Sequence, residues 1–195
     1  MRQFRRGFKS WAEAKSVDLR RALQLRPEAT LPMIKLAEHL QTDVIGPAEI
    51  PGVSPELLHQ LLMTGRSDWS AVTLQLPGRT VIIQNIAHSP ARQRSDITHE
   101  LAHGICGHKA EQIVVLPGFP FPMRDFDDAQ EDEATWLSGC LLLPRQALLW
   151  AARRGMTDDE VCDHFGTSVD LTRFRRKMTG IDKQLEATMR TRCDR

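Results

Sequence analysis

The spacing of apolar residues predicts helices in both terminal parts of the chain. Residues 8–24 carry Phe8, Trp11, Ala12, Val17 and Leu19 among basic positions, which is the pattern of an amphipathic helix. Proline and glycine divide the later apolar runs into separate segments. Further helices are therefore expected at residues 33–40, 55–64, 91–106, 128–143, 145–154, 157–164 and 168–178.

The period changes in the middle of the chain. Residues 70–76 alternate between apolar and polar, Pro77 and Gly78 provide a turn, and residues 80–85 form a second apolar run, so a β-hairpin is expected. Residues 112–116 are a candidate third strand, and residues 117–126 are expected to be a loop rich in proline and glycine. The predicted fold is α+β: a mostly helical core with a small antiparallel sheet of about three strands beside the helix at 91–106.

That helix carries the sequence His99-Glu100-Leu101-Ala102-His103. Residues four apart lie on one face of a helix, so the two imidazoles can bind one metal ion. Glu100 then projects beside the metal, where it can take a proton from a water molecule. Ile97, Leu101 and Ala102 make this helix apolar, and a buried histidine needs a partner. The pattern predicts a zinc hydrolase with Glu100 as general base.

Catalytic zinc needs a third protein ligand. A third histidine in the extended pattern is excluded, because positions 106 and 109 hold cysteine and lysine, and His108 is one residue out of register. Glu131 shares a helical face with small and apolar residues, which directs it toward the motif helix. Glu133 lies on another side of the same helix and is the second candidate.

Other residues are candidates for supporting roles. The chain contains no tyrosine, so His88, Arg92 and Arg124 are considered as oxyanion or substrate contacts. Cys106 is either a redox-sensitive neighbour of the metal, a competing ligand, or a small buried apolar residue. Residues 80–85 are a candidate edge strand to which an extended substrate could add.

Composition adds few constraints. The net charge of +1 requires no nucleic-acid partner, although basic residues cluster toward both termini and acidic residues between 125 and 133. The helices at 157–179 resemble a helix-turn-helix whose second helix carries four basic residues, and two short helices that pack on the core are the alternative. Those basic residues are Arg173, Arg175, Arg176 and Lys177.

Length and cysteine usage suggest the organisation and compartment. No segment is long and apolar enough to span a bilayer, and no apolar stretch of a signal peptide follows the basic N-terminus, so no membrane association is expected. The four cysteines have no paired spacing, which favours a reducing cytoplasm. The expected division is an N-terminal helical segment at 1–65, a zinc peptidase core at 66–155 and C-terminal helices at 156–195, unless all three pack as one domain.

Two segments together resemble the ImmA/IrrE-type metallopeptidases. RQRSDITHELAH, from Arg92 to His103, is similar to the start of that family's active-site helix. EDEATWLSGCLLLP, from Glu131 to Pro144, is similar to its second signature, E-x-E-A-N-x-F-A-x-x-L-L-M-P. Thr135 and Leu137 depart from this signature, and Thr135 is a shorter partner for a ligand histidine than the usual Asn or Asp.

The resemblance, which covers roughly residues 65–180, implies a function. It implies one Zn²⁺ per chain, with Glu131 as the third ligand beside His99 and His103. It implies a cytoplasmic, site-specific endopeptidase that cleaves a cognate helix-turn-helix repressor and so derepresses stress, mobile-element or phage-defence genes. Nucleic acid is a further candidate partner, as an activator or through the basic termini. The alternative is a DNA-binding regulator with a structural or vestigial zinc site.

Overall fold

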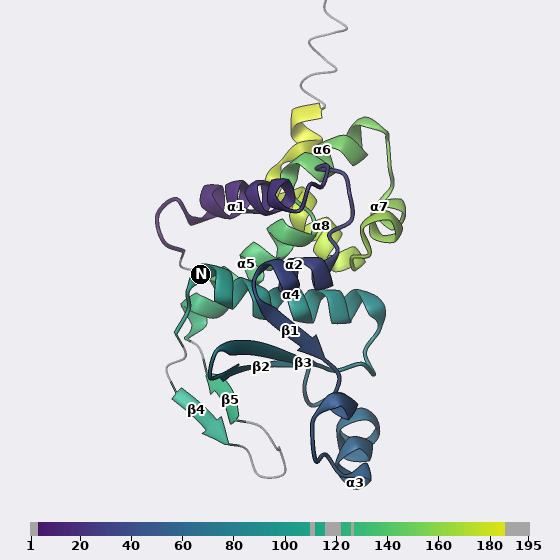
Figure 1. The fold of residues 1–195 in the computed structure, drawn as a ribbon. Coiled ribbons are helices and arrows are strands. Elements are labelled where there is room, and N and C mark those ends of the chain that lie inside the picture. Colours follow the sequence, from purple (N-terminus) through teal and green to yellow (C-terminus); the bar gives the residue numbers. More distant parts are fainter. Residues whose placement is uncertain (1–3, 110–111, 116–121, 126, 186–195) are drawn as a thin grey trace, which may run out of the picture.

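The computed structural model of the chain describes residues 4–109, 112–115, 122–125 and 127–185. It is mostly helical, and its short strands lie in the middle part of the chain (Figure 1). In chain order the elements are α1 (Phe8–Ala22), α2 (Met33–His39), β1 (Thr42–Ile45), η1 (Pro47–Glu49), α3 (Pro55–His59), η2 (Gln60–Thr64), β2 (Ala71–Leu76), β3 (Arg79–Gln84), α4 (Pro90–Cys106), β4 (Gln112–Val115), β5 (Pro122–Asp125), α5 (Asp128–Leu142), α6 (Arg145–Arg153), α7 (Asp158–Phe165) and α8 (Val169–Thr179).

The motif helix α4 lies at the centre of the molecule (Figure 1). The three-stranded sheet lies on one side of α4, and α5 packs along the other, with α1 and the C-terminal helices beyond it. The α+β class and the positions of the predicted helices are confirmed. One detail differs: the expected helix at 55–64 is α-helical only to His59 and continues as the π-helix η2.

The main sheet is mixed, with the strand order β1-β3-β2. The predicted hairpin is confirmed as the antiparallel pair β2 and β3, whereas β1 pairs with β3 in parallel. The expectation of an all-antiparallel sheet was therefore wrong. The strand at 80–85 is also central rather than an edge, because both of its sides are already hydrogen-bonded, and β2 is the outer strand next to α4.

The expected third strand at 112–116 exists as β4 but belongs to a different sheet. It pairs antiparallel with β5, so that Gln112 lies opposite Asp125 and Val115 opposite Pro122. β5 lies within residues expected to form a loop, so that prediction was wrong for Pro122–Asp125. The hairpin β4–β5 lies beside β2 (Figure 1).

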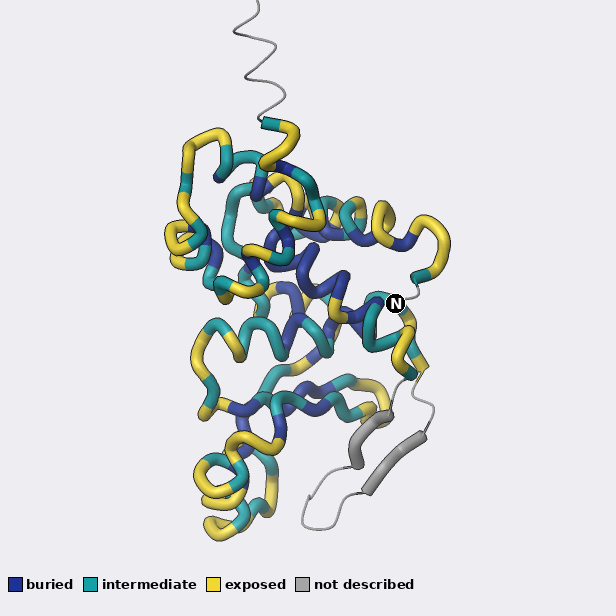
Figure 2. The backbone as a smooth tube through the Cα atoms, turned by 180° about the vertical axis from the view of Figure 1, so that it is seen from behind, coloured by how far each residue is buried: buried dark blue, intermediate teal, exposed yellow. Residues whose placement is uncertain are grey.

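The two faces of the main sheet bury different cores. Ile82 on β3 belongs to the largest apolar cluster, which also contains Ile97 and Leu101 of α4. Val81 and Ile83 point to the opposite face, where they pack with Trp69 and residues of η2. Figure 2 shows that the buried residues concentrate along the central helices, whereas the end of the molecule that carries α3 is largely exposed.

Helix α5 is the most deeply buried helix, and side chains from two other helices bind its C-terminal carbonyl oxygens. The last carbonyls of a helix have no partner within it. Ser16 Oγ donates to the carbonyl of Cys140 at 2.7 Å, and Arg20 Nη1 donates to that of Leu141 at 2.7 Å. Arg175 of α8 donates to the carbonyl of Leu143 at 3.0 Å. Burial lowers the pKa of Arg20 only to about 10, so this cation remains charged and complements the negative end of the helix dipole.

The basic residues of α8 are mostly engaged inside the molecule. Arg175 is buried and forms an ion pair with Glu13. Arg173 and Arg176 both pair with Asp158, and Arg176 also donates to the carbonyl of Met156 at 2.7 Å. These contacts fit two helices packed on the core better than a surface that contacts phosphates. Among the described helices, none combines the length and the apolar character needed to cross a bilayer.

We predict that the bonds to the end of α5 contribute strongly to stability. Arg20→Met should lower the free energy of unfolding by about 1–3 kcal/mol, because it leaves the buried carbonyl of Leu141 without its donor. Urea denaturation followed by circular dichroism measures the difference. Arg21→Met is the matched control, because Arg21 is exposed and its ion pair is with the exposed Asp18, and it should change stability by less than about 0.5 kcal/mol. Equal effects of the two substitutions would contradict the prediction.

Candidate metal centre

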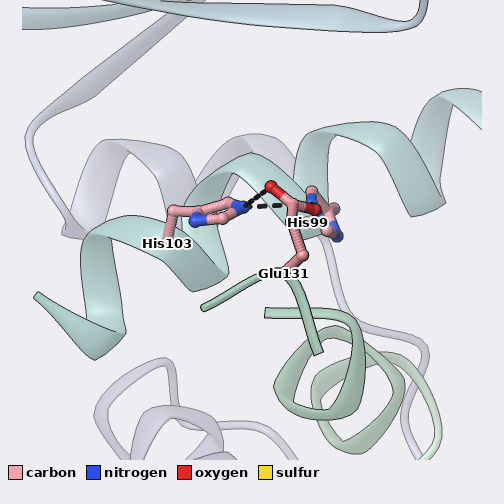
Figure 3. A group of neighbouring side chains, drawn as sticks. All are labelled: His99, His103 and Glu131. Carbon is pink, nitrogen blue, oxygen red and sulfur yellow. Dashed lines mark hydrogen bonds and ion pairs between the residues drawn. The ribbon is translucent and has the colours of Figure 1, made fainter. Parts of the chain in front are cut away.

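The structure brings His99, His103 and Glu131 together at the contact between α4 and α5 (Figure 3). The Nε2 atoms of the two histidines lie 3.1 Å apart. Glu131 reaches across from the first turn of α5, with Oε2 3.1 Å from His99 Nε2 and Oε1 3.3 Å from His103 Nε2. We call these three residues the metal triplet.

The helix pair positions the triplet through small side chains. Ala134 and Ser138 follow Glu131 at helical spacing, and both are buried against neighbouring elements. Asp127 caps α5 by accepting a hydrogen bond from the backbone N–H of Gln130 at 2.7 Å, so the helix begins just before Glu131. The capped first turn of α5 therefore holds the carboxylate of Glu131 level with the two imidazoles of α4.

The donor chemistry of the triplet fits a transition metal. Two imidazole nitrogens and a carboxylate oxygen converge within 4.8 Å of one another. Two nitrogens with lone pairs repel each other unless a proton or a cation lies between them. Two histidines and one glutamate form a common ligand set for catalytic zinc, which leaves a coordination position open. These residues could hold such an ion without rearrangement of the helices.

Burial and charge act on the triplet in opposite directions. Burial lowers the pKa of His99, but the carboxylates of Glu131, Glu100 and Asp96 outweigh it, so that the pKa is raised. For His103, burial and the neighbouring histidines prevail over Glu131, and the pKa is lowered. Hydrogen bonds from His103 and His99 hold the pKa of Glu131 well below its usual range. In the metal-free chain the surrounding carboxylates therefore favour the protonated form of His99, and a metal ion would compete with that proton.

Glu100 points from the motif helix to the sheet. The hydroxyl of Thr73, on the outer strand β2, donates to Glu100 Oε2 at 2.5 Å. Glu100 and His103 both line a cavity of about 330 Å³ between α4 and the sheet. The predicted general base thus lies beside the triplet and at the wall of a space that is large enough for a side chain.

The sheet wall of this cavity is polar because of strand alternation. Thr73 lies opposite Ile82, and Gln75 lies opposite Thr80, which is itself opposite Thr42 of β1. All five positions lie on the face turned to α4 and line the cavity. Val72 and Leu74 of β2 point to the other face, so the alternation that predicted this strand also supplies the hydroxyls beside Glu100.

The structure places Glu133 and His108 outside the triplet. Their side chains lie together with Cys106 in a second group of metal-ligating residue types, which also spans 4.8 Å. His108 Nδ1 approaches His103 Nδ1 at 3.0 Å, so His108 contacts the triplet from behind. Burial and the charge of Glu133 raise the pKa of the Cys106 thiol to about 12, which disfavours a reactive thiolate at this position.

The three candidates for oxyanion or substrate contacts are not brought to the triplet by described contacts. The side chain of His88, in the loop between β3 and α4, is buried, with Nδ1 3.0 Å from Asp96 Oδ2 and Nε2 3.1 Å from the carbonyl of Arg66. Arg92 is half exposed and pairs with Asp96 at 3.8 Å. The side chain of Arg124 lies outside the described residues. His88 and Arg92 thus support the start of α4.

Sequence reasoning missed Thr73 and Arg5. Thr73 belongs to a strand that was predicted correctly, but its partner Glu100 is 27 residues away, and no local pattern connects them. Arg5 precedes the first helix and forms an ion pair with Glu133 at 2.7 Å, a contact across most of the chain. Only the basic cluster at the N-terminus and the acidic start of α5 indicated that such a pair could form.

Comparison with known protein families gives one result for this chain. The family model of peptidase family M78, described as the IrrE N-terminal-like domain, matches residues 58–177. Neither the curated proteins nor the solved structures gave a match. The matched segment includes β2, β3, the motif helix and all of α5, and therefore the whole metal triplet and Glu100. The chain thus belongs to the IrrE N-terminal-like family of metallopeptidases.

Proposed function

We propose that this protein is a zinc-dependent endopeptidase that cleaves a helix-turn-helix repressor in the cytoplasm. The observation that carries the catalytic part is the convergence of two imidazole nitrogens and a carboxylate beside a glutamate that lines a cavity. The repressor, the cytoplasmic site and the derepression of stress, mobile-element or phage-defence genes come from the resemblance of the two signature segments to ImmA/IrrE-type peptidases.

His99, His103 and Glu131 would hold the zinc ion. When bound, zinc supplies a Lewis acid that polarises the scissile carbonyl and makes a nearby water molecule more acidic. Glu100 accepts the proton of the attacking water on its carboxylate and later passes it to the amide nitrogen of the leaving chain. The Thr73 hydroxyl fixes Glu100 Oε2, so the carboxylate is oriented before the substrate arrives.

The substrate would approach along the outer strand. β2 is an outer strand of the main sheet, beside the hairpin β4–β5, and carries Thr73, so an extended peptide that pairs with β2 passes beside Glu100. Such pairing requires an extended backbone, which suits an unfolded linker between the domains of a repressor. The cavity of about 330 Å³ could receive one substrate side chain among the hydroxyls of Thr42, Thr73 and Thr80.

We predict that Glu131 and Glu133 differ in their effect on zinc. Glu131→Ala should reduce zinc binding to below about 0.2 ion per chain after dialysis, because it removes one of three ligands. Glu133→Ala should retain most of its zinc under the same conditions, although with weaker affinity. Elemental analysis of the purified variants measures both. A larger loss in Glu133→Ala, or no zinc in the unmodified protein after loading, would refute the proposed ligand set.

A second prediction concerns Thr73. Thr73→Val keeps the shape of the side chain but removes the donor to Glu100, so kcat should fall by about 10- to 100-fold while zinc content stays unchanged. Thr73→Ser restores the hydroxyl and should recover most of the rate. Steady-state kinetics with a peptide that the unmodified protein cleaves give the kcat values of the two variants for comparison. Equal rates for the valine and serine variants would show that this hydrogen bond does not prepare Glu100.

The decisive variant for the enzymatic function is Glu100→Gln. It preserves shape and zinc ligation but removes the base, so cleavage should fall by at least about 10²–10⁴-fold. Mass-spectrometric mapping of new protein N-termini in cells that express the unmodified protein or the variant identifies the substrate. We expect a cut helix-turn-helix repressor only with the unmodified protein.

The outcomes of this comparison separate the parts of the proposal. A cut protein of another class would retain the peptidase and refute the repressor as its substrate. Derepression of a target gene at the same level with Glu100→Gln would show that the chain acts by binding, which is the DNA-binding alternative. Identical N-termini in both samples would argue against hydrolysis altogether.

A further inference from the structure

A hydrogen-bonded chain of side chains extends from the metal triplet to the N-terminal segment. His103 Nδ1 lies 3.0 Å from His108 Nδ1, and His108 Nε2 lies 3.3 Å from Glu133 Oε2. Arg5 binds the same carboxylate through two contacts, with Nε 2.8 Å from Oε1 and Nη2 2.7 Å from Oε2. We call His108, Glu133 and Arg5 the outer network.

The end of the motif helix explains why His108 lies behind His103. Gly107 adopts a φ of 69°, the left-handed conformation that ends many helices and that glycine adopts without strain. The N–H of His108 then donates back to the carbonyl of His103 at 3.0 Å. This reversal brings the ring of His108 to 5.1 Å from the ring of His103, with the planes at 70° to each other.

The direction of the hydrogen bonds follows from the atoms that meet. Two Nδ1 atoms at 3.0 Å require one proton between them, so one ring donates and the other accepts. If His103 binds a cation through Nε2, its proton must be on Nδ1, and His103 is the donor. His108 then accepts at Nδ1 and carries its own proton on Nε2, which donates to Glu133. With a cation on His103 Nε2 and both rings neutral, this is the one set of tautomers that satisfies both contacts of His108.

The N-terminal segment is held in place independently of the metal. Phe4 packs edge-on against Trp136 of α5, with ring centroids 5.1 Å apart, and it stacks on Phe8 at 5.7 Å. The ammonium group of Lys9 lies 4.3 Å from the centre of the Trp136 ring. These contacts hold Arg5 next to Glu133, whose side chain is only 7% exposed. A buried carboxylate is stable as a charged acceptor only with such a cation.

We propose that the outer network is a positioning relay that holds His103 in the Nδ1-protonated tautomer and so sets the affinity of the site for zinc. The inference rests on the proposed function, because it requires His103 to bind zinc through Nε2. His108, Glu133 and Arg5 do not touch the reacting atoms and act through His103. Arg5 lies outside the segment matched by the family model, and through its contact with Glu133 the N-terminal segment of this chain supports the metal centre.

A second ion bound by Cys106, His108 and Glu133 is the competing interpretation of the same cluster. Glu133 already carries a two-contact ion pair with Arg5, and His108 already faces His103 through Nδ1. The protonated thiol of Cys106 would also have to lose its proton to bind. The relay uses every one of these contacts and does not require Cys106, so the two interpretations predict different behaviour of Cys106→Ser.

Zinc affinity tests the relay. The full-length chain is stripped of metal and titrated with Zn²⁺ against a chromogenic chelator. His108→Leu should weaken binding by about 10- to 100-fold, and His108→Asn, whose Oδ1 takes the place of the accepting nitrogen, should recover part of this loss. Arg5→Met should weaken binding by about three- to tenfold, because Glu133 stays in place. Arg5 is 61% exposed, so its loss should leave the fold intact, which circular dichroism verifies.

Two matched controls define the result. Arg6→Met removes the same charge from the next exposed position and should bind zinc like the unmodified chain, as should Cys106→Ser. Unchanged affinity in His108→Leu and Arg5→Met would overturn the relay while leaving the zinc site intact. Two zinc ions per chain, with one lost in Cys106→Ser, would also overturn it. An unmodified chain that binds no zinc would instead refute the proposed function.

The tautomers give a readout that a merely structural role would not produce. In the zinc-loaded chain with ¹⁵N-labelled histidine, long-range proton–nitrogen correlation spectra should show the proton of His103 on Nδ1 and that of His108 on Nε2. In Glu133→Ala the acceptor for His108 Nε2 is lost, so the ring is no longer held against His103, the bond between the two Nδ1 atoms should weaken, and His108 should populate both tautomers. A proton on Nδ1 of His108 in the unmodified chain would overturn the proposal.

Discussion

The close packing of α4 against α5 is the constraint on which the rest of the structure depends. The metal triplet takes two residues from α4 and one from α5, so the distances between its ligand atoms depend on the distance between the two helix axes. Ala134 and Ser138 allow the backbones to approach, and both are buried. A larger side chain at either position would move Glu131 away from both histidines together, because all three groups meet at one point.

This packing in turn depends on how the ends of α5 are satisfied. A helix buried on most sides exposes its terminal carbonyls to a medium that contains no water, and each unpaired group is costly. Here the C-terminal carbonyls are bonded by residues far away in the sequence, Ser16 and Arg20 of α1 and Arg175 of α8. Near the N-terminus of the helix, Arg5 pairs with the side chain of Glu133. Basic residues that appear as surface charge in the sequence thus stabilise the interior.

Much of the fold could be predicted from the sequence because its signals are local. The helices have clear apolar periodicity, and the hairpin of β2 and β3 has alternation with a turn between its strands. Strand β1 gave no such signal, because it has only four residues and pairs in parallel with a strand more than thirty residues later. Without β1, the pattern predicts β3 as an edge strand. Strand β5 also has only four residues, and the proline and glycine around it favour a loop.

The residues of the candidate site also divide into those that local spacing predicts and those that only tertiary contacts bring together. His99, Glu100 and His103 lie within one helical turn, so their spacing carries the information. Glu131 could be ranked above Glu133 because helical periodicity places it with Ala134 and Ser138, and the structure finds it beside the two histidines. His108 could be excluded as a member of the extended histidine pattern, yet its contact with His103 depends on the left-handed turn at Gly107. Thr73 and Arg5 reach their partners only through tertiary structure.

These distant contacts imply that the family-matched segment is not a self-sufficient unit in this chain. Residues 58–177 contain the triplet and Glu100, but not α1, whose Ser16 and Arg20 bind the end of α5, nor Arg5. Without α1, the carbonyls of Cys140 and Leu141 and the apolar face that buries Leu19 and Ala12 would be open to water. The N-terminal helix therefore completes the same core that carries the metal triplet, and the geometry of the site is a property of the longer chain.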